Sequence, residues 1–174
     1  LEFLTQKGKY VPLDLRKVAS ITTTKGMFFR DDGEAERLVF NNWDPKVFEG
    51  VPFQLIDPQG DRVPNAIMLH GDFGVKAPTM PHSAKLPLNA PAKVIHMLGG
   101  IGGWSFPAVA EKSVTMIVRL HYADGKTEDH ELRNGVHFSD YIRRVDVPES
   151  KFAYGMRGGQ QVRYLKIEPK RTEP

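Results

Sequence analysis

The chain has 174 residues, of which 40% are hydrophobic, and this is enough for one well-buried core but not for two large ones. Its 24 basic residues are interleaved with 21 acidic ones and leave a formal charge of +3, which argues against a dedicated nucleic-acid-binding protein. No apolar run approaches the roughly 20 residues that cross a bilayer, and the absence of cysteine excludes disulfides, thiolate nucleophiles and cysteine-ligated zinc.

Turn-forming residues are frequent throughout the chain. There are 16 glycines and 13 prolines, a proportion that is typical of short strands joined by tight turns and high for a helical protein. We therefore expect an all-β fold, an antiparallel β-sandwich or jelly roll with a few single helical turns, in one domain over residues 10–169. Residues 1–9 are expected to be a flexible N-terminal segment or a cloning remnant, and residues 170–174 a tail.

Three segments of the N-terminal half have the composition of strands. They are Tyr10 to Leu15, Val51 to Asp57 and Ala66 to His70. Pro12 places the first of them at a sheet edge or a strand start. Before the second, Asp44 and Pro45 combine an N-cap residue with a proline at the first helical position, which predicts a single helical turn.

Asp31, Asp32 and Glu34 form an acidic run around a glycine. Because calcium prefers carboxylate oxygens, these residues are weak candidates for a calcium site, although the run lacks the alternating ligands of an EF-hand. A surface turn explains the same residues. No other cofactor is indicated.

The segment Leu98 to Pro107, LGGIGGWSFP, follows a short apolar run from Lys93 to Leu98 that is expected to be a strand. It lacks the Lys-Ser or Lys-Thr pair and the glycine spacing of a phosphate-binding loop. Its four glycines permit close backbone approach around Trp104. An exposed Trp104 would be a platform for the C–H face of a sugar ring, whereas a buried one would close the end of the sandwich. Both interpretations stay open.

The stretch from Ser113 to Gly135 predicts a β-hairpin. A long apolar strand leads into Asp124-Gly125, which is one of the strongest hairpin-turn signals, and a charged strand returns. A two-residue loop would pair Arg119 with His130. A three-residue loop with a bulge would pair Arg119 with Asp129 instead.

The two faces of this hairpin are expected to differ. Val118, Leu120 and Tyr122 alternate along the first strand and are assigned to the core, while Arg119 faces outward. The run from Glu128 to Glu131 is interpreted as a solvated strand face. A metal site is the minority alternative, because neighbouring strand residues point to opposite faces.

The segment after the hairpin, from Asn134 to Arg144, is dense in polar side chains. Together with Trp104, the candidate ligand-binding residues are Asn134, His137, Asp140, Tyr141 and Arg143. Amide, carboxylate and guanidinium groups of this kind would fix the hydroxyl groups of a sugar. The alternative is an ordinary loop, in which Asp140 pairs with a neighbouring arginine while Tyr141 packs.

The C-terminal part predicts a closing hairpin, with strands from Lys151 to Met156 and from Gln161 to Ile167. Signals for catalysis are weak. The six histidines never form the i,i+4 pair of a zincin, and no G-x-S-x-G elbow is present. Adjacent carboxylates do not provide the facing geometry of a glycosidase. We therefore expect no enzyme and no catalytic residues.

Three blocks, GVPFQLIDPQGDRVPNAIML, HMLGGIGGWSFP and SVTMIVRLHYADGKTEDHELRNGVHFSDYIRRVDVP, carry a family resemblance over most of the chain. The chain resembles an accessory β-domain of large multidomain proteins of planctomycetes and related bacteria. In those proteins the domain stands beside c-type cytochrome, dehydrogenase-like propeller or similar modules. The resemblance implies an exported, extracytoplasmic, galactose-binding-like sandwich that serves as a carbohydrate-binding module and carries no haem itself.

Two classes of function remain open from the sequence. In the first, the domain binds polysaccharide or oligosaccharide and tethers an attached enzyme or electron-transfer unit to it. In the second, it is a structural or docking domain that packs against neighbouring domains of its parent chain. Neither class involves nucleic acid or insertion into a membrane.

Overall fold

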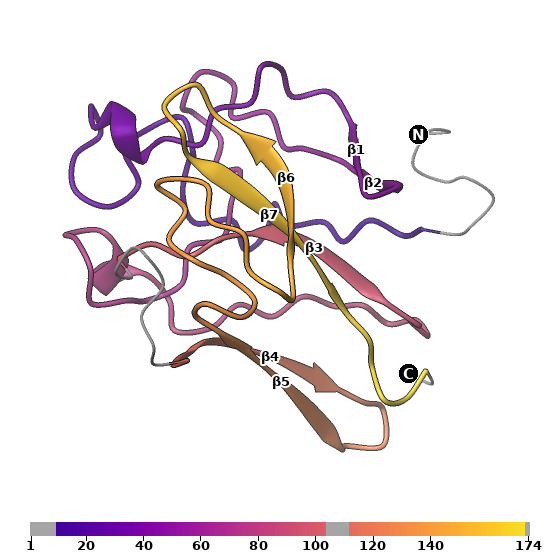
Figure 1. Cartoon of the computed structure of the whole chain (residues 1–174). Helices are drawn as coiled ribbons and strands as arrows, with labels where there is room; N and C mark the ends of the chain where they lie inside the picture. The colour runs from indigo at the N-terminus through magenta and orange to yellow at the C-terminus, as the bar shows by residue number, and fades with distance from the viewer. Residues whose placement is uncertain (1–9, 104–111, 173–174) are drawn as a thin grey trace. The chain divides into compact units, whose positions relative to one another are not determined.

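Regular secondary structure in the computed structural model consists of short antiparallel strands (Figure 1). The structure describes residues 10–103 and 112–172. Within these ranges, helical structure is limited to two 3-10 turns, η2 at Glu34–Glu36 and η3 at Ala77–Thr79. The predicted all-β class is therefore confirmed.

The chain divides into two compact units. Unit 1 contains Leu1–Leu88 and Met156–Gln160, and unit 2 contains Asn89–Gly155 and Gln161–Pro174. Each unit has its own hydrogen-bonded sheet structure. The single domain predicted over residues 10–169 stays a prediction.

Unit 1 contains one short hairpin, formed by β1 at Lys46–Phe48 and β2 at Val51–Phe53. Glu49 and Gly50 connect the strands and both have positive φ, 51° and 75°, as the mirror-image turn of a tight hairpin requires. The helical turn predicted at Asp44-Pro45 is wrong, because Pro45 leads directly into β1. Val47 and Phe48 of β1, a β-branched and an aromatic residue, favour the extended chain over a helical turn.

Most of the remaining described residues of unit 1 are irregular. The strands predicted at Tyr10 to Leu15 and Ala66 to His70 are wrong. Residues 10–15 pair with no strand of the described chain, and Ala66 forms only a single antiparallel bridge, with Ile21. The Ser20 hydroxyl accepts the Met68 N–H at 2.8 Å and donates to its carbonyl at 3.1 Å. A side chain here occupies backbone groups that a ladder would pair.

Unit 2 contains two antiparallel sheets. The three-stranded sheet has the order β3–β7–β6, with β3 at Ile95–Gly99, β7 at Gln161–Ile167 and β6 at Lys151–Gly155. The two-stranded sheet pairs β4 at Val114–His121 with β5 at Thr127–Arg133. The strand predicted at Lys93 to Leu98 and both predicted hairpins of the C-terminal half are thus confirmed, with small shifts of their ends.

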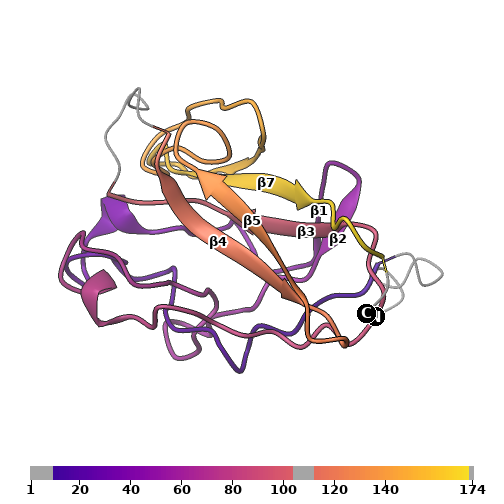
Figure 2. The ribbon, with the colours of Figure 1, turned by 90° about the horizontal axis from the view of Figure 1, so that it is seen from below.

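The two sheets of unit 2 share one hydrophobic core. Leu132 from β5 and Leu165 and Ile167 from β7 form a buried cluster with Phe138. Partly buried side chains of β3 and β4, among them Met97 and Val118, pack against it. In Figure 2 the β4–β5 hairpin crosses in front of β3.

The register of the β4–β5 hairpin corresponds to the three-residue loop with a bulge. Arg119 pairs with Asp129, and its guanidinium group donates two hydrogen bonds of 2.6 Å to that carboxylate. Gly125 has a φ of 82°, the left-handed conformation that ends such a loop. The sequence left two registers open, and the structure has the second.

Glu128 corrects the prediction of a uniformly solvated return strand. It is only 8% exposed, because it lies on the same face of β5 as the buried Leu132. The Tyr122 hydroxyl donates to its carboxylate at 2.7 Å, and the Lys170 N–H does so at 3.0 Å. Asp129 and Glu131 on the opposite face are exposed, as predicted. Within the described residues, no group of three or more acidic or histidine side chains is placed to hold a metal ion.

The buried guanidinium group of Arg163 connects β7 to the loop that precedes β6. Arg163 is 1% exposed. It donates to the Ser150 hydroxyl at 3.0 Å and carbonyl at 2.6 Å, to the Val145 carbonyl at 3.2 Å and to the Asp146 carboxylate at 2.8 Å. A fifth hydrogen bond, of 3.3 Å, reaches Gln161 on the same strand. Arg163 thus satisfies polar groups that would otherwise be buried without partners.

Methionine at this position would keep an unbranched side chain and remove every donor. We expect Arg163→Met to lower the free energy of unfolding by about 3 kcal/mol, because the Val145 and Ser150 carbonyls lose their partners. Lys166 is exposed on the same strand, so Lys166→Met should change that free energy by less than about 0.5 kcal/mol. Urea unfolding followed by circular dichroism measures both variants. Equal stability of the two would show that the Arg163 hydrogen bonds are dispensable.

Candidate functional site

The polar segment from Asn134 to Arg144 is held within unit 2 by backbone hydrogen bonds to Ile101 and to β7. The Tyr141 N–H donates to the Ile101 carbonyl at 2.8 Å, and the Gln161 N–H donates to the Tyr141 carbonyl at 2.8 Å. The Gln161 side chain donates to the Arg143 carbonyl at 3.0 Å. No helical turn forms from Ser139 to Arg143, because the backbone groups of Tyr141 bond to Ile101 and Gln161 instead.

Most predicted ligand-binding residues of this segment are buried. The exposed fractions are 0% for Asn134, 5% for Tyr141 and 9% for Asp140. Asp140 accepts the Ile142 N–H at 3.1 Å, so its carboxylate supports the local turn. Of the five residues proposed here, Arg143 is the exposed one. These five residues lie in one segment of the chain, but most of their side chains are turned away from solvent and could not contact a ligand there.

His137 is half-buried and supports the same turn. Its Nδ1 accepts the Arg133 N–H at 3.0 Å, which requires the neutral ring. Burial lowers the pKa of His137, Glu149 opposes this shift and Arg133 adds to it. The imidazole ring therefore acts as a backbone acceptor.

The histidine shift predicts a pH dependence of stability. Because the pKa of His137 is lower in the folded chain than the ordinary value of about 6.5, the unfolded chain binds more protons between the two values. Stability is therefore complete above about pH 6.5 and falls as the pH drops through the folded pKa. We expect His137→Asn to flatten the decline between about pH 7.5 and 5.5, a range above the titration of most carboxylates.

Chemical unfolding at several pH values measures this effect. His96 also has a pKa lowered by burial and then by Lys166, so a smaller decline should remain in the variant. An unchanged slope in His137→Asn would contradict the assignment of His137.

The glycines before Trp104 have a packing role in unit 2. A Cβ atom on Gly99 would lie 3.4 Å from the Phe138 ring, and one on Gly100 would lie 3.3 Å from the Tyr141 side chain. The predicted close approach of this backbone is therefore observed between it and the polar segment. Trp104 itself lies outside the described residues.

In the acidic run of unit 1, Asp31 and Asp32 form ion pairs with basic side chains. Asp31 accepts a short hydrogen bond from Lys76, and Lys25 Nζ lies 3.6 Å from its other oxygen. Asp32 accepts from Arg30 at 2.7 Å. The Lys76 hydrogen bond is the main cause of the lowered pKa of Asp31, which favours the carboxylate form. The calcium candidates Asp31 and Asp32 thus each face a basic side chain, and the third candidate, Glu34, begins η2.

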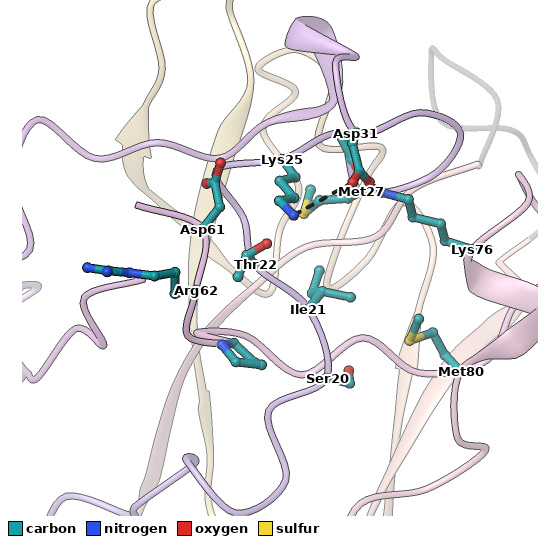
Figure 3. Close-up of a pocket in the computed structure, with 12 residues that line it drawn as sticks. Ser20, Ile21, Thr22, Lys25, Met27, Asp31, Asp61, Arg62, Lys76 and Met80 are labelled. Atoms are coloured by element: carbon teal, nitrogen blue, oxygen red, sulfur yellow. Dashed lines mark hydrogen bonds and ion pairs between the residues drawn. The ribbon is translucent and has the colours of Figure 1, made fainter. Parts of the chain in front are cut away.

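Next to Asp31, unit 1 contains a pocket of about 280 Å³ (Figure 3). Its apolar lining is provided by Ile21, Met27, Pro64 and Met80. Its polar lining contains Ser20, Thr22, Lys25, Asp31, Asp61, Arg62 and Lys76. Figure 3 shows Lys25 and Lys76 approaching Asp31 from two sides. The pocket therefore combines hydroxyl, carboxylate and ammonium groups with an apolar surface.

Three polar groups of the pocket are available to a ligand. Thr22 and Asp61 make no side-chain hydrogen bond within the described residues, and Lys25 Nζ is beyond hydrogen-bond distance of Asp31. Asp61 has a φ of 73° and is exposed. The unpaired carboxylate and hydroxyl groups, and the N–H groups of the Lys25 ammonium that is ion-paired with Asp31, can bind the hydroxyl groups of a ligand that displaces water.

Sequence analysis missed this pocket. It is assembled from loops around residues 20–31, 61–64 and 76–80, with no strand to fix a spacing. One local signal was Gly26, because a Cβ there would lie 1.8 Å from the Arg30 carbonyl. The pairing of Asp31 with Lys76 spans 45 residues and leaves no local pattern.

Comparisons with known proteins do not supply a relative. No family model, no curated protein and no solved structure matches the chain. A search of the described residues for helices long and apolar enough to cross a membrane finds none.

Proposed function

We propose that the chain is a non-catalytic carbohydrate-binding module and that the pocket of unit 1 is its sugar site. The observation that carries this proposal is the pairing of an apolar lining with unpaired polar groups in one pocket. A pyranose ring has an apolar C–H face and a rim of hydroxyl groups, so it needs both kinds of surface. Met27 and Met80 would contact the face, and Thr22 and Asp61 would bind hydroxyl groups.

The wider arrangement follows the family resemblance of the sequence. We take unit 2 to be a galactose-binding-like β-sandwich, a proposal supported by two sheets that bury one cluster around Leu165. Its polar segment is buried, so it would serve as the scaffold of the module. In the parent protein, an exported planctomycete-type multidomain chain, such a module would hold an attached enzyme or electron-transfer domain on polysaccharide.

A docking function is the second candidate, and exposed aromatic residues of unit 1 favour it. Phe29 and Phe73 are each 45% exposed and form an edge-to-face pair with centroids 5.2 Å apart. Val75 beside them in sequence is 62% exposed. Such a cluster would pack against a neighbouring domain of the same chain.

A glycan array followed by calorimetry tests the sugar site. We expect binding to at least one polysaccharide, and a loss of about tenfold in affinity for Asp61→Asn, because the variant loses the charge of a hydrogen-bond acceptor. Asparagine tolerates the positive φ of this position, so the fold should be kept.

Asp44→Asn is the matched control, since Asp44 is exposed in the same unit and does not line the pocket. It should bind as the wild type does. If no glycan on the array is bound, or if Asp61→Asn binds as tightly as Asp44→Asn, the pocket is not a sugar site and docking becomes the better proposal.

A further inference from the structure

The pocket of unit 1 has more basic than acidic side chains. Lys25, Arg62 and Lys76 line it against Asp31 and Asp61. Net positive charge in a partly enclosed site favours an anionic ligand, since the surrounding protein screens charge less than bulk water does. The excess charge therefore bears on which sugar the pocket prefers.

The three basic groups are not equally free. The Lys76 ammonium group donates to the Gly26 carbonyl at 2.5 Å and to Asp31, so it is committed to the loop. The Arg62 guanidinium group donates to the Gln59 carbonyl at 2.9 Å, and its side chain extends away from the other pocket residues in Figure 3. Lys25 is ion-paired with Asp31 at 3.6 Å but donates no hydrogen bond within 3.5 Å among the described residues, so its ammonium group can still donate to a ligand.

The environment of Lys25 matches a single carboxylate. Its side chain is 38% exposed, and Asp31 at 3.6 Å orients the ammonium group without hydrogen-bonding it. Lys25 and the apolar Met27 both line the pocket, so a charged group and an apolar surface are offered to the same ligand. A uronic acid would complement this lining, because it has a carboxylate at one edge of a ring whose face is apolar.

We propose that the ligand is an acidic polysaccharide built from uronic acids, and that the Lys25 ammonium group binds the uronate carboxylate. This inference rests on the proposed sugar site and specifies its ligand. Asp61 and Thr22 would bind ring hydroxyl groups on the uncharged side of the sugar. Because the contact is an ion pair near the surface, its contribution falls as salt rises.

Three polymers separate the alternatives in affinity gels and calorimetry with the full chain. They are polygalacturonate, neutral galactan and dextran sulfate. We expect polygalacturonate to bind at least tenfold more tightly than galactan and more tightly than dextran sulfate. Lys25→Gln should lose about tenfold in affinity for polygalacturonate and nothing for galactan, while Lys85→Gln, at an exposed position outside the pocket, should keep the wild-type affinity.

Each contrary result has a separate meaning. If galactan or dextran sulfate binds as tightly as polygalacturonate, or if Lys25→Gln keeps full affinity, the uronate inference is wrong. Galactan binding that is lost in Asp61→Asn would leave the sugar site standing without the uronate. If none of the three polymers and no glycan of the array is retained, the sugar site itself is wrong. Thermal unfolding of both variants checks that they are folded.

Discussion

The buried guanidinium group of Arg163 is the interaction on which the architecture of unit 2 depends. An arginine that is 1% exposed is unfavourable unless its donors are satisfied, and here backbone carbonyls, a hydroxyl and a carboxylate satisfy them. These acceptors all belong to the loop over residues 145–150, apart from Gln161. One side chain therefore fixes an irregular loop to a central strand without any regular pairing.

This constraint decides which polar residues are free to act. Gln161 and Arg163 hold the chain from Tyr141 to Ser150 against β7, so the polar side chains that resemble a binding loop are used for folding. His137 and Asp140 accept backbone N–H groups, as capping residues do. In unit 1, by contrast, the pocket retains unpaired polar groups next to methionine side chains. A pocket with such groups is the better candidate for recognition of a ligand.

The sequence predicted the parts of this fold that depend on local pattern. The β4–β5 hairpin followed from Asp124-Gly125 between an apolar and a charged strand, and β7 from the alternation of Gln161 to Ile167. Glu128 was misjudged, because it shares the buried face of β5 with Leu132 and one of its hydrogen-bond partners, Lys170, lies 42 residues away. The pocket could not be predicted for a similar reason, because Asp31 and Lys76 meet only after folding. The burial of the polar segment likewise depends on a distant residue, Gln161. Composition showed the residue types, but long-range hydrogen bonds determined their exposure.

Native-state hydrogen exchange gives the most direct test of the central claim that Gln161 and Arg163 together hold the chain from Tyr141 to Ser150 against β7. The amides of Tyr141 and Gln161 report on this closure, because each donates at 2.8 Å to a carbonyl of a neighbouring segment. The account predicts that both amides exchange only through global unfolding, with protection like that of the β7 core amides. Exchange of these two amides as fast as that of the exposed Arg144 would show that the segment opens freely, and the account would then be wrong.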